Sequence, residues 1–341
     1  MTHNIKNVII STNLTSLIIE GYNMKHDKLD KVNNFTGDYL DTEEAMARVS
    51  WYYYKQGMTQ TAIAKKLNTN RIRIMKMLEK ARDTGIVEIR IKRDYYNILE
   101  IERDLIEKFN LVDAMVIPYH RDRDLNECIG IGAAQYLSMI LKANDVIGVG
   151  WGDTVSKTIR YLSLDHLGEF YIVSLTGGVL SFIYEGVFFG KYSKNIRILP
   201  APLLVANEKV AKAIHEEPEV KTIMNMVKIA NYALIGVGAL NTNATIIREG
   251  YITEDEFALL RQKGAIGDIL GQFFDGNGNR VRYDTDKRLI AYPIEKLREI
   301  PNVIAVAGGS HKVKAIRASL MGRYVKTLIT DEKTAYELLK T

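Results

Sequence analysis

The sequence predicts an α/β protein with two parts: an N-terminal winged helix-turn-helix and a larger Rossmann-like domain built on a parallel sheet. Two patterns lead to this prediction. Three short amphipathic helices and a basic strand follow one another within residues 41–93, and from Asp113 onward short apolar runs alternate with amphipathic helices. The length of 341 residues, with 47% hydrophobic and 26% charged residues, suits a soluble protein of two or more domains.

The first helix is expected in the segment ARVSWYYYKQG. Val49, Tyr52 and Tyr53 recur at spacings of three and four, which predicts that they share one buried face. Gly57 ends this helix. Thr59 is then placed to cap a second helix, TQTAIAKKL, because its hydroxyl can accept a hydrogen bond from a free N–H of the first turn.

The second helix is expected to bury Ile63 and Leu67 on one side. The small Ala62 and Ala64 would permit close crossing with a neighbouring helix. A tight turn at Asn68-Thr69 ends the segment.

A third helix, RIRIMKMLEKARDTG, can be capped by Asn70. Its inward positions are Ile74, Met77, Leu78 and Ala81, and its outward positions are Arg71, Arg73, Lys76 and Lys80. This is the layout of a recognition helix that enters the major groove of DNA.

The charge of the same segment indicates contact with nucleic acid. Residues 65–93 contain ten Lys or Arg against three Asp or Glu, a local net charge of +7 that exceeds the +5 of the whole chain. Phosphate contact needs such an excess, since binding is driven largely by release of condensed counterions. The alternative interpretation is a solvated basic helix in an ordinary bundle. The residues expected to contact DNA are Thr59, Gln60, Asn70, Arg71, Arg73 and Lys76.

The segment IVEIRIK, after Gly85, is expected to be the edge strand of a wing. Its alternation would place Ile86, Glu88, Arg90 and Lys92 on one face and Val87, Ile89 and Ile91 on the other.

Residues 1–40 show weak periodicity and many polar residues, so we expect a disordered tail. Glu20-Gly21, shortly before Met24, could be the translation of a purine-rich ribosome-binding site, which would make Met24 the natural start. A start at Met1 is the alternative, and the mass of the native protein would distinguish the two.

Residues 94–110 are expected to form a linker helix. Ile98, Ile101, Leu105 and Phe109 make one helical stripe, with acidic residues elsewhere. Two interpretations stay open: the stripe pairs with a second subunit, as a palindromic DNA site would require, or it packs on its own domain.

Residues 111–341 are expected to form a domain with helices on both faces of a parallel sheet. The apolar runs that predict its strands are DAMVIP, DVIGVG, FYIVSL, NIRILP, YALIGVG, VIAVAGG and YVKTLIT. In such sheets ligands bind outside the carboxyl ends of the strands, so the loops that leave the strands are the candidate site.

Four of these loops are rich in glycine. The first loop is GVGWGDTVSK, in which Gly148, Gly150 and Gly152 precede Asp153 and Thr154 at a helix start; free backbone N–H groups and the positive end of the helix dipole there suit a phosphate. A dinucleotide site competes with this interpretation, but the third glycine that such a site has after Gly148 and Gly150 is missing, because Asp153 occupies its place. The other loops contain Gly177 and Gly178, Gly236 and Gly238, and Gly308 and Gly309. A tight turn would explain the glycines of any one loop, whereas four such loops favour a ligand site.

Three charged or titratable side chains lie close to glycines in the sequence. Lys312 lies in the first turn of a helix, where it opposes the helix dipole unless an anion is present, so we expect a phosphate between helix N-termini and Lys312. Asp268 could accept hydrogen bonds from sugar hydroxyls or cap a local turn. His311 is expected to face solvent without a role in the site.

Composition argues against several other kinds of site. The single Cys128 excludes an intramolecular disulfide, and the six histidines show no metal-ligand spacing, so no metal and no cofactor is expected. The apolar stretch from Val8 to Ile19 is broken by polar residues and is too short to span a bilayer. We therefore expect a cytoplasmic protein without a membrane segment.

From about Glu43 to its C-terminus the chain resembles the SorC family of bacterial sugar-responsive transcriptional regulators. The segments that carry the resemblance are MTQTAIAKKL, KMLEKARDTGIVEI, GIGAAQYL, LTGGV, PAPLL, NATIIREGYI, GAIGDILGQFFD and VAGGSHKVKAI. Three segments, IGIGAAQYL, ATIIREGYI and GAIGDILGQFFD, are particularly similar to the repressor of the uptake operon for the quorum signal autoinducer-2.

The resemblance implies a dimer or tetramer that binds operator DNA through its N-terminal domain and a phosphorylated sugar through its C-terminal domain, which is similar to sugar-phosphate isomerases and deaminases. By motif it implies ligand contacts at Gly152, Asp153, Thr154, Gly177, Gly178, Asp268 and Lys312. Trp151 and Asp153 replace a Phe and a Glu of the autoinducer-2 repressor, and Met75 stands where members commonly have Ser. The effector and the operator sequence therefore do not carry over.

The leading expectation is a repressor that a phosphorylated sugar, such as phospho-autoinducer-2, releases from operator DNA. An enzyme acting on sugar phosphates is the second class, but its acid–base set would need a His beside a carboxylate, and the loops offer Asp153, Asp268 and Lys312 without a well-placed His. A protein without catalytic residues is therefore expected. An activator, or a regulator that responds to a different sugar or polyol, is the third possibility.

Overall fold

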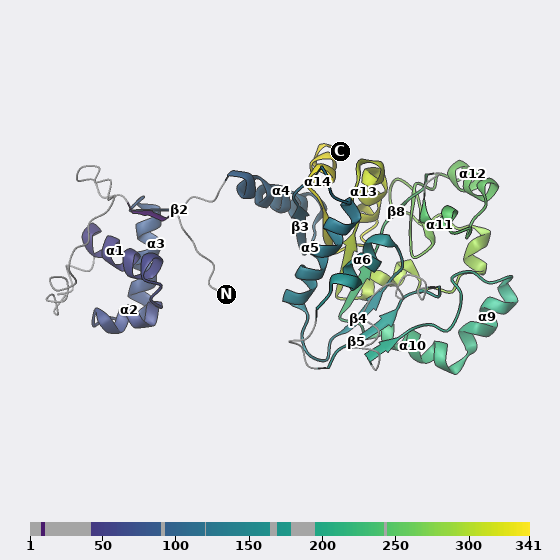
Figure 1. The fold of residues 1–341 in the computed structure, drawn as a ribbon, viewed down its shortest axis with the longest axis horizontal. Helices are drawn as coiled ribbons and strands as arrows, with labels where there is room; N and C mark the ends of the chain where they lie inside the picture. The colour runs from purple at the N-terminus through teal and green to yellow at the C-terminus, as the bar shows by residue number, and fades with distance from the viewer. Residues whose placement is uncertain are drawn as a thin grey trace. The chain divides into compact units, whose positions relative to one another are not determined.

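The structure, a computed structural model, describes residues 8–10, 42–89, 93–119, 121–163, 169–178, 195–241 and 244–341. The chain divides into two compact units, Met1–Arg93 and Asp94–Thr341 (Figure 1). The wing positions Arg90, Ile91 and Lys92 and the alternative start at Met24 lie outside the described residues.

The smaller unit contains the three expected helices. They are α1 (Glu43–Ser50), which continues into a π-helical turn (Trp51–Lys55), α2 (Gln60–Lys66) and α3 (Arg71–Asp83). Gly57 and Asn68 adopt φ angles of +66° and +49° at the two bends, as the expected helix ends require. Ile63 and Ile74 are fully buried between the helices, together with Val49.

Two residues of this unit that were expected to lie at contacts between helices are exposed instead. Tyr53 is 36% exposed, because the π-helical turn has more residues per turn than an α-helix and rotates Tyr53 away from the face that Val49 and Tyr52 share. Ala62 is also exposed, since the inward face of α2 consists of Ile63, Ala64 and Leu67, so only Ala64 lies at the helix crossing.

Strand β2 (Val87–Ile89) occupies the expected wing position, but its partner was not foreseen. It pairs in antiparallel register with β1 (Val8–Ile10), a short β-branched run inside the segment expected to be a disordered tail. Ile86 and Val87 are both buried, contrary to the predicted alternation, because Ile86 precedes the strand and packs with the helices. Glu88 is exposed.

The larger unit is built on a seven-stranded sheet in which all pairings are parallel, as the sequence predicted. The strands are β3 (Asp113–Ile117), β4 (Val146–Val149), β5 (Tyr171–Ser174), β6 (Ile196–Arg197), β7 (Tyr232–Ile235), β11 (Asn302–Val306) and β12 (Thr327–Asp331). Their order in the sheet is β3-β12-β11-β7-β4-β5-β6. From β4 the chain proceeds outward to β5 and β6, whereas from β7 it proceeds the other way, so the topological switch point lies between β4 and β7.

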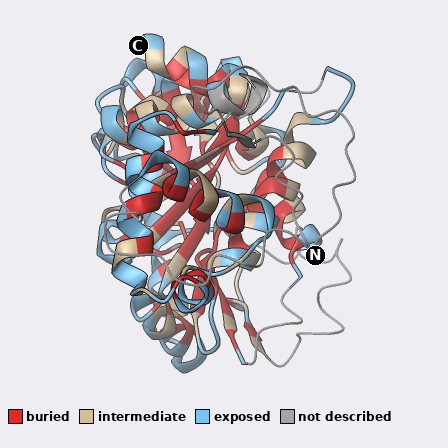
Figure 2. Cartoon of the chain, turned by 90° about the vertical axis from the view of Figure 1, so that its left-hand side faces the viewer, coloured by how far each residue is buried: buried red, intermediate tan, exposed pale blue. Residues whose placement is uncertain are grey.

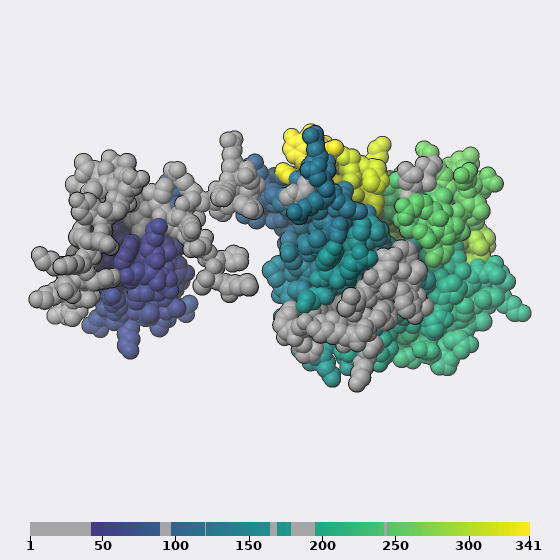
Figure 3. All heavy atoms as spheres, in the orientation of Figure 1, coloured from purple at the N-terminus to yellow at the C-terminus, as the bar shows by residue number. Residues whose placement is uncertain are grey.

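Helices cover both faces of this sheet (Figure 1). One face is covered by α4 (Arg93–Phe109), α10 (Pro218–Lys228), α13 (Val313–Met321) and α14 (Glu332–Lys340), and the other by α5 (Leu125–Ile140) and α6 (Asp153–Tyr161). Three further helices, α9 (Glu208–Glu216), α11 (Thr245–Arg248) and α12 (Glu254–Gln262), pack in separate clusters. A second, antiparallel sheet contains β8 (Gly238–Ala239), β9 (Gly267–Ile269) and β10 (Gln272–Phe274). In Figure 3 the side chains of α5 and α6 lie on the face turned to the viewer.

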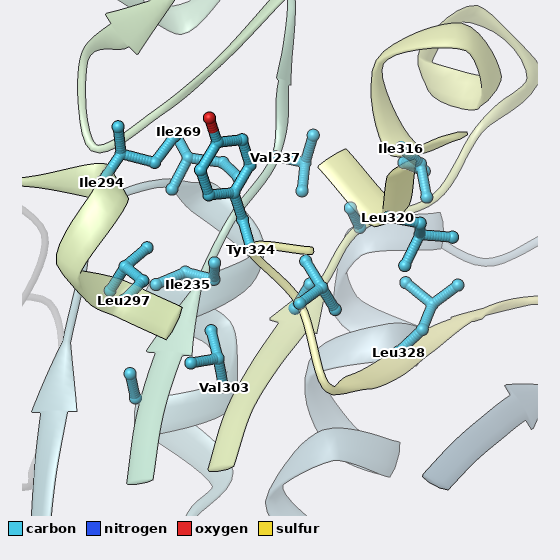
Figure 4. Close-up of a cluster of buried hydrophobic side chains, with 14 of the residues drawn as sticks. Ile235, Val237, Ile269, Ile294, Leu297, Val303, Ile316, Leu320, Tyr324 and Leu328 are labelled. Carbon is cyan, nitrogen blue, oxygen red and sulfur yellow. The ribbon is translucent and has the colours of Figure 1, made fainter. Parts of the chain in front are cut away.

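The alternation of side chains along each strand creates two cores, one on each face of the sheet. Val303 and Ala305 of β11 pack with α4, α10, α13 and α14, whereas Ile304 and Val306 pack with α5 and α6. Figure 2 shows the buried residues along the strands and on the inward sides of the helices. In the first core, Tyr324 lies among aliphatic side chains (Figure 4) and donates a hydrogen bond from its hydroxyl to the carbonyl oxygen of Gly278, at 2.9 Å.

The expected linker helix, α4, packs on the larger unit. Leu105 is fully buried, and Ile98, Ile101 and Phe109 are partly buried in the same core. The Glu102 carboxylate accepts a hydrogen bond of 2.7 Å from the backbone N–H of Val116 on the edge strand β3. Of the two interpretations of the stripe, packing on its own domain is therefore confirmed. Within the described part of the chain, no helix is both long and apolar enough to cross a membrane.

Candidate functional site

The helix-turn-helix surface is ordered by side-chain caps at the starts of α2 and α3. The Thr59 hydroxyl accepts a hydrogen bond from the N–H of Ala62 at 3.2 Å, and the Asn70 side chain accepts one from the N–H of Arg73 at 2.8 Å. These caps fix where each helix begins and therefore which residues face outward.

Helix α3 carries three of the six residues expected to contact DNA, Arg71, Arg73 and Lys76. Arg71 and Lys76 are exposed and Arg73 is partly exposed. Arg71 donates a hydrogen bond from Nε to Oε1 of Gln60 at 3.3 Å, which links the start of α3 to the start of α2 and orients the guanidinium. Five of the six candidate DNA residues thus lie at the starts of α2 and α3, and Lys76 lies further along α3.

Tyr53, Thr59, Gln60, Thr61 and Arg71 line a shallow hollow beside these helix starts. A buried Tyr53 was expected from an unbroken α-helix, whereas the π-helical turn places this side chain at the surface. Residues 51–54 are four consecutive aromatic residues, and one face of a helix can bury only some of them. This pattern could have indicated that at least one of them lies at the surface.

The larger unit contains a cavity of about 120 Å³ at the carboxyl ends of β4, β7 and β11. These three strands are neighbours in the sheet and span the topological switch point, where ligands bind in open parallel sheets. The residues that line the cavity are Asn126, Trp151, Gly152, Asp153, Thr154, Val155, Gly236, Val237, Gly238, Ala239, Asn241, Ala244, Thr245, Ile246, Asp268, Leu270, Val306, His311 and Lys312.

Five of the nine effector residues expected from the sequence line this cavity. They are Gly152, Asp153, Thr154, Asp268 and Lys312. They come from the loop after β4, from β9 and from the turn after β11, so segments far apart in the sequence are brought together.

The start of α6 faces the cavity without a cap. Gly152, with φ of +128°, precedes the helix, and no side chain caps it. The first N–H groups of a helix have no intrahelical acceptor, and the helix dipole adds partial positive charge there. This helix end can therefore bind an anion.

Lys312 brings a positive charge to the same cavity. It is partly buried at the start of α13, and its ammonium has no hydrogen-bond or ion-pair partner among the residues that the structure describes. Burial lowers the pKa of Lys312, and the nearby carboxylates of Asp268 and Asp153 oppose this effect. An anionic ligand would form a charge-assisted hydrogen bond with the Lys312 ammonium.

Asp153 is held by neighbours from two helices. Its Oδ2 accepts hydrogen bonds from Nδ2 of Asn126 at 2.7 Å and from Nζ of Lys157 at 2.9 Å. Lys157 also bridges to Asp124 at the start of α5, at 3.0 Å. This network joins the starts of α5 and α6 and fixes one polar wall of the cavity.

Of the two roles left open by its sequence, Asp268 takes that of capping a local turn, and it also lies at the cavity. Its carboxylate accepts a hydrogen bond of 3.2 Å from the N–H of Gly271 in the tight turn between β9 and β10. The side chain is buried, which raises the pKa of Asp268 to about 6, although the hydrogen bond from Gly271 and the charge of Lys312 lower it. It lies directly against Gly238, where an added Cβ would be 2.0 Å from Oδ1.

The two remaining pairs of expected glycines do not line the cavity. Gly177 and Gly178 donate their N–H groups to the carbonyl oxygens of Ile290 and Ala201, both at 2.9 Å. A Cβ at Gly177 would meet the carbonyl oxygen of Pro202 at 2.3 Å, so this glycine permits a close approach of two loops. The segment that follows, 179–194, lies outside the described residues.

Gly308 and Gly309 are likewise engaged within the protein. The N–H of Gly309 donates to Oδ2 of Asp331 at 3.0 Å and to Oγ1 of Thr334 at 2.7 Å. A Cβ at Gly308 would lie 2.4 Å from the same Asp331 oxygen. These glycines let the turn after β11 pack against the start of α14, and that turn presents Lys312.

Three polar residues of the cavity were not selected from the sequence as ligand residues: Asn126, Asn241 and Thr245. Nothing in their local patterns distinguishes them from surface residues. His311 is exposed as expected, and it also lies at the cavity; whether it has a role there stays a prediction. The short 3₁₀ turn Ser310–Lys312 brings it to the cavity beside Lys312. Burial, followed by the charge of Lys312, lowers the pKa of His311.

Among the described residues, no group of three or more His, Cys, Asp or Glu side chains is arranged to hold a metal ion.

Comparison with known proteins identifies the family. The family model described as "Putative sugar-binding domain" matches residues 93–340. Transcriptional regulator LsrR of Klebsiella pneumoniae is 35% identical over 321 residues, which cover 93% of this chain and 99% of that protein. The regulator of the same name from Escherichia coli K12 is 35% identical over 303 residues, which cover 88% and 95%.

Solved structures agree with these relatives. The full-length sorbitol operon regulator SorC from Klebsiella pneumoniae matches with a TM-score of 0.65 at 27% identity, over 88% of this chain and 99% of that chain. The sugar-binding domain of a transcriptional repressor from Vibrio fischeri matches with a TM-score of 0.62 at 28% identity, over 71% and 98%. The chain therefore belongs to the SorC family of sugar-binding bacterial transcriptional regulators.

Proposed function

We propose that this regulator is a repressor that binds operator DNA through residues 41–93 and is released when a phosphorylated sugar binds the cavity of the larger unit. The observation that carries the effector proposal is the Lys312 ammonium, which has no hydrogen-bond or ion-pair partner among the described residues and lines the same cavity as the uncapped start of α6. A phosphate would accept hydrogen bonds from both, and Asp153, Asp268 and Asn126, which line the same cavity, would contact sugar hydroxyls. Phospho-autoinducer-2 is the first candidate, because of the family resemblance.

The mechanism is thermodynamic linkage. A ligand that binds more tightly to the conformation with low DNA affinity shifts the population toward it by its difference in affinity between the two states. A palindromic operator would require a dimer or tetramer, which we propose as the working state in the cytoplasm.

The effector proposal is tested by calorimetric titration of the full chain with phosphorylated sugars and their unphosphorylated counterparts. The variant Lys312→Met should weaken phosphorylated ligands roughly 10- to 100-fold, the loss of one charge-assisted hydrogen bond, and should leave neutral ligands nearly unchanged. Lys314→Met is the matched control, since Lys314 is exposed on the same helix and does not line the cavity. Equal losses for both ligand types would refute the phosphate site.

An enzyme acting on sugar phosphates is the second candidate. One observation favours it: His311 and Asp268 line the same cavity, which supplies the imidazole and carboxylate that the sequence analysis did not find together. The names of the relatives favour a regulator. Turnover of a sugar phosphate by the purified protein, followed by NMR, would support the enzyme, and an unchanged substrate would support the regulator.

A further inference from the structure

Helix α3 exposes two large apolar side chains on its outward face. Ile72 is 63% exposed and Met75 is 46% exposed, although the helix already buries Ile74, Met77 and Leu78 on its opposite side. Ile72 and Met75 are three positions apart, so they are neighbours on the helix surface. The expected DNA-contacting residues Arg71 and Lys76 flank them in the sequence.

These two side chains contribute nothing to the fold of the smaller unit. Neither belongs to the buried core of the three helices, and a β-branched Ile has lower helix propensity than Ala, Lys or Arg. The stability of the smaller unit therefore does not explain why Ile72 and Met75 are apolar. Contact with another molecule would explain it.

The major groove of DNA offers one apolar group on its base edges, the C5-methyl of thymine. Ile72 and Met75 are separated by about 4.5 Å along the helix axis, close to the roughly 3.4 Å between successive base pairs. Two neighbouring thymine methyls could therefore be contacted at once. The unbranched thioether of Met75 can adapt to the position of its methyl group.

We infer that Ile72 and Met75 read thymines in the operator through contact with their methyl groups, while Arg71 and Lys76 supply charge. The inference rests on the proposed binding of DNA by α3. It assigns base specificity to two apolar side chains that are not among the basic and polar residues expected to contact DNA.

Deoxyuridine tests this inference, because it differs from thymidine in these probes only by lacking the methyl group on the base. The full-length protein first selects its sites from a random duplex library, and each thymine of the selected site is then replaced singly by deoxyuridine. Loss of one contacted methyl should weaken binding about fourfold, which corresponds to roughly 0.8 kcal/mol for one buried apolar carbon. Ile72→Ala should abolish this effect at one thymine and Met75→Ala at another.

Lys76→Ala is the matched control. It should weaken binding to thymine and deoxyuridine probes by the same factor and leave their ratio unchanged. Because the readout is a ratio of affinities for one variant, a general loss of stability would not produce the expected result.

A selected site that tolerates deoxyuridine at every thymine would overturn the inference, as would a ratio that persists in both alanine variants. If Ile72→Ala changed the sedimentation of the protein and left the ratio intact, the two side chains would contact a second copy of the chain, which also overturns it. Failure to select any DNA sequence would instead overturn the proposed function, and the inference with it.

Discussion

Replacing the buried carboxyl of the cavity, Asp268→Asn, should stabilise the larger unit at neutral pH. Asp268 is buried, and its pKa is raised from 3.8 to about 6. The folded protein therefore holds a proton that the unfolded chain releases between these two values, and stability falls as the pH rises through this range. A pKa raised from 3.8 to about 6 corresponds to up to about 3 kcal/mol, at 1.36 kcal/mol for each tenfold change in proton affinity.

Asparagine keeps the acceptor for the N–H of Gly271 and removes the titration. The stability gained by Asp268→Asn should be near zero at pH 4, rise through pH 4–6 and remain constant above the pKa of about 6. Urea unfolding in a Trp51→Phe background measures it, because the buried Trp151 then reports on the larger unit alone.

Asp275→Asn provides a control with the opposite sign. Although burial raises the pKa of Asp275, hydrogen bonds from Asn279 and Asn277 lower it below its ordinary value. Its stabilising effect is present above pH 3.8 and is lost as the pH falls through the lowered pKa, so the variant should be less stable than the wild type at pH 7. A gain from Asp268→Asn that does not change with pH, or a loss at pH 7, would refute the reasoning about Asp268.

Three further variants test the local structure. Asn70→Ala removes the cap of α3 and should destabilise the smaller unit by about 1 kcal/mol in thermal unfolding, while an unchanged melting temperature would mean that the cap contributes nothing. Gly238→Ala should destabilise the larger unit by more than about 2 kcal/mol, since its Cβ would lie 2.0 Å from the Asp268 carboxylate. Gly236→Ala, with its nearest contact at 3.5 Å, is the control, and equal effects would contradict the assignment. Asn68→Gly should stabilise the smaller unit by about 0.5 kcal/mol in the same thermal assay, because Asn68 has φ of +49° and glycine carries no strain there; a loss of stability would show that the Asn68 side chain matters more.

The parallel sheet could be predicted because each of its strands is an apolar run bounded by turn residues. Helix α3 could be predicted because its cap residue, its inward apolar positions and its outward basic positions fall at helical spacing. Lys312 and Asp268 could each be predicted separately as a ligand residue, since each is a charged side chain close to a glycine and to an apolar segment. That both residues line one cavity depends on the order of the strands in the sheet, which changes direction between β4 and β7. The hydrophobic periodicity of the sequence does not reveal this order.

Other features could not be predicted for physical reasons. A glycine pair in a loop has the same sequence pattern whether it approaches a ligand or another loop, and Gly177 approaches the carbonyl oxygen of Pro202. The π-helical turn that exposes Tyr53 could not be predicted, because the same residues are compatible with an unbroken α-helix. The pairing of β1 with β2 joins segments almost eighty residues apart, and a three-residue apolar run is too short to indicate a partner.

Release of operator DNA by a phosphorylated sugar is measured by equilibrium binding of the full chain to DNA from upstream of its own gene cluster, with and without phosphorylated sugars. We expect a salt-dependent complex that a phosphorylated sugar such as phospho-autoinducer-2 dissociates, and that the same ligand fails to dissociate when the protein carries Lys312→Met. A complex that no phosphorylated sugar weakens, or one that is released equally from the wild type and from Lys312→Met, would contradict it.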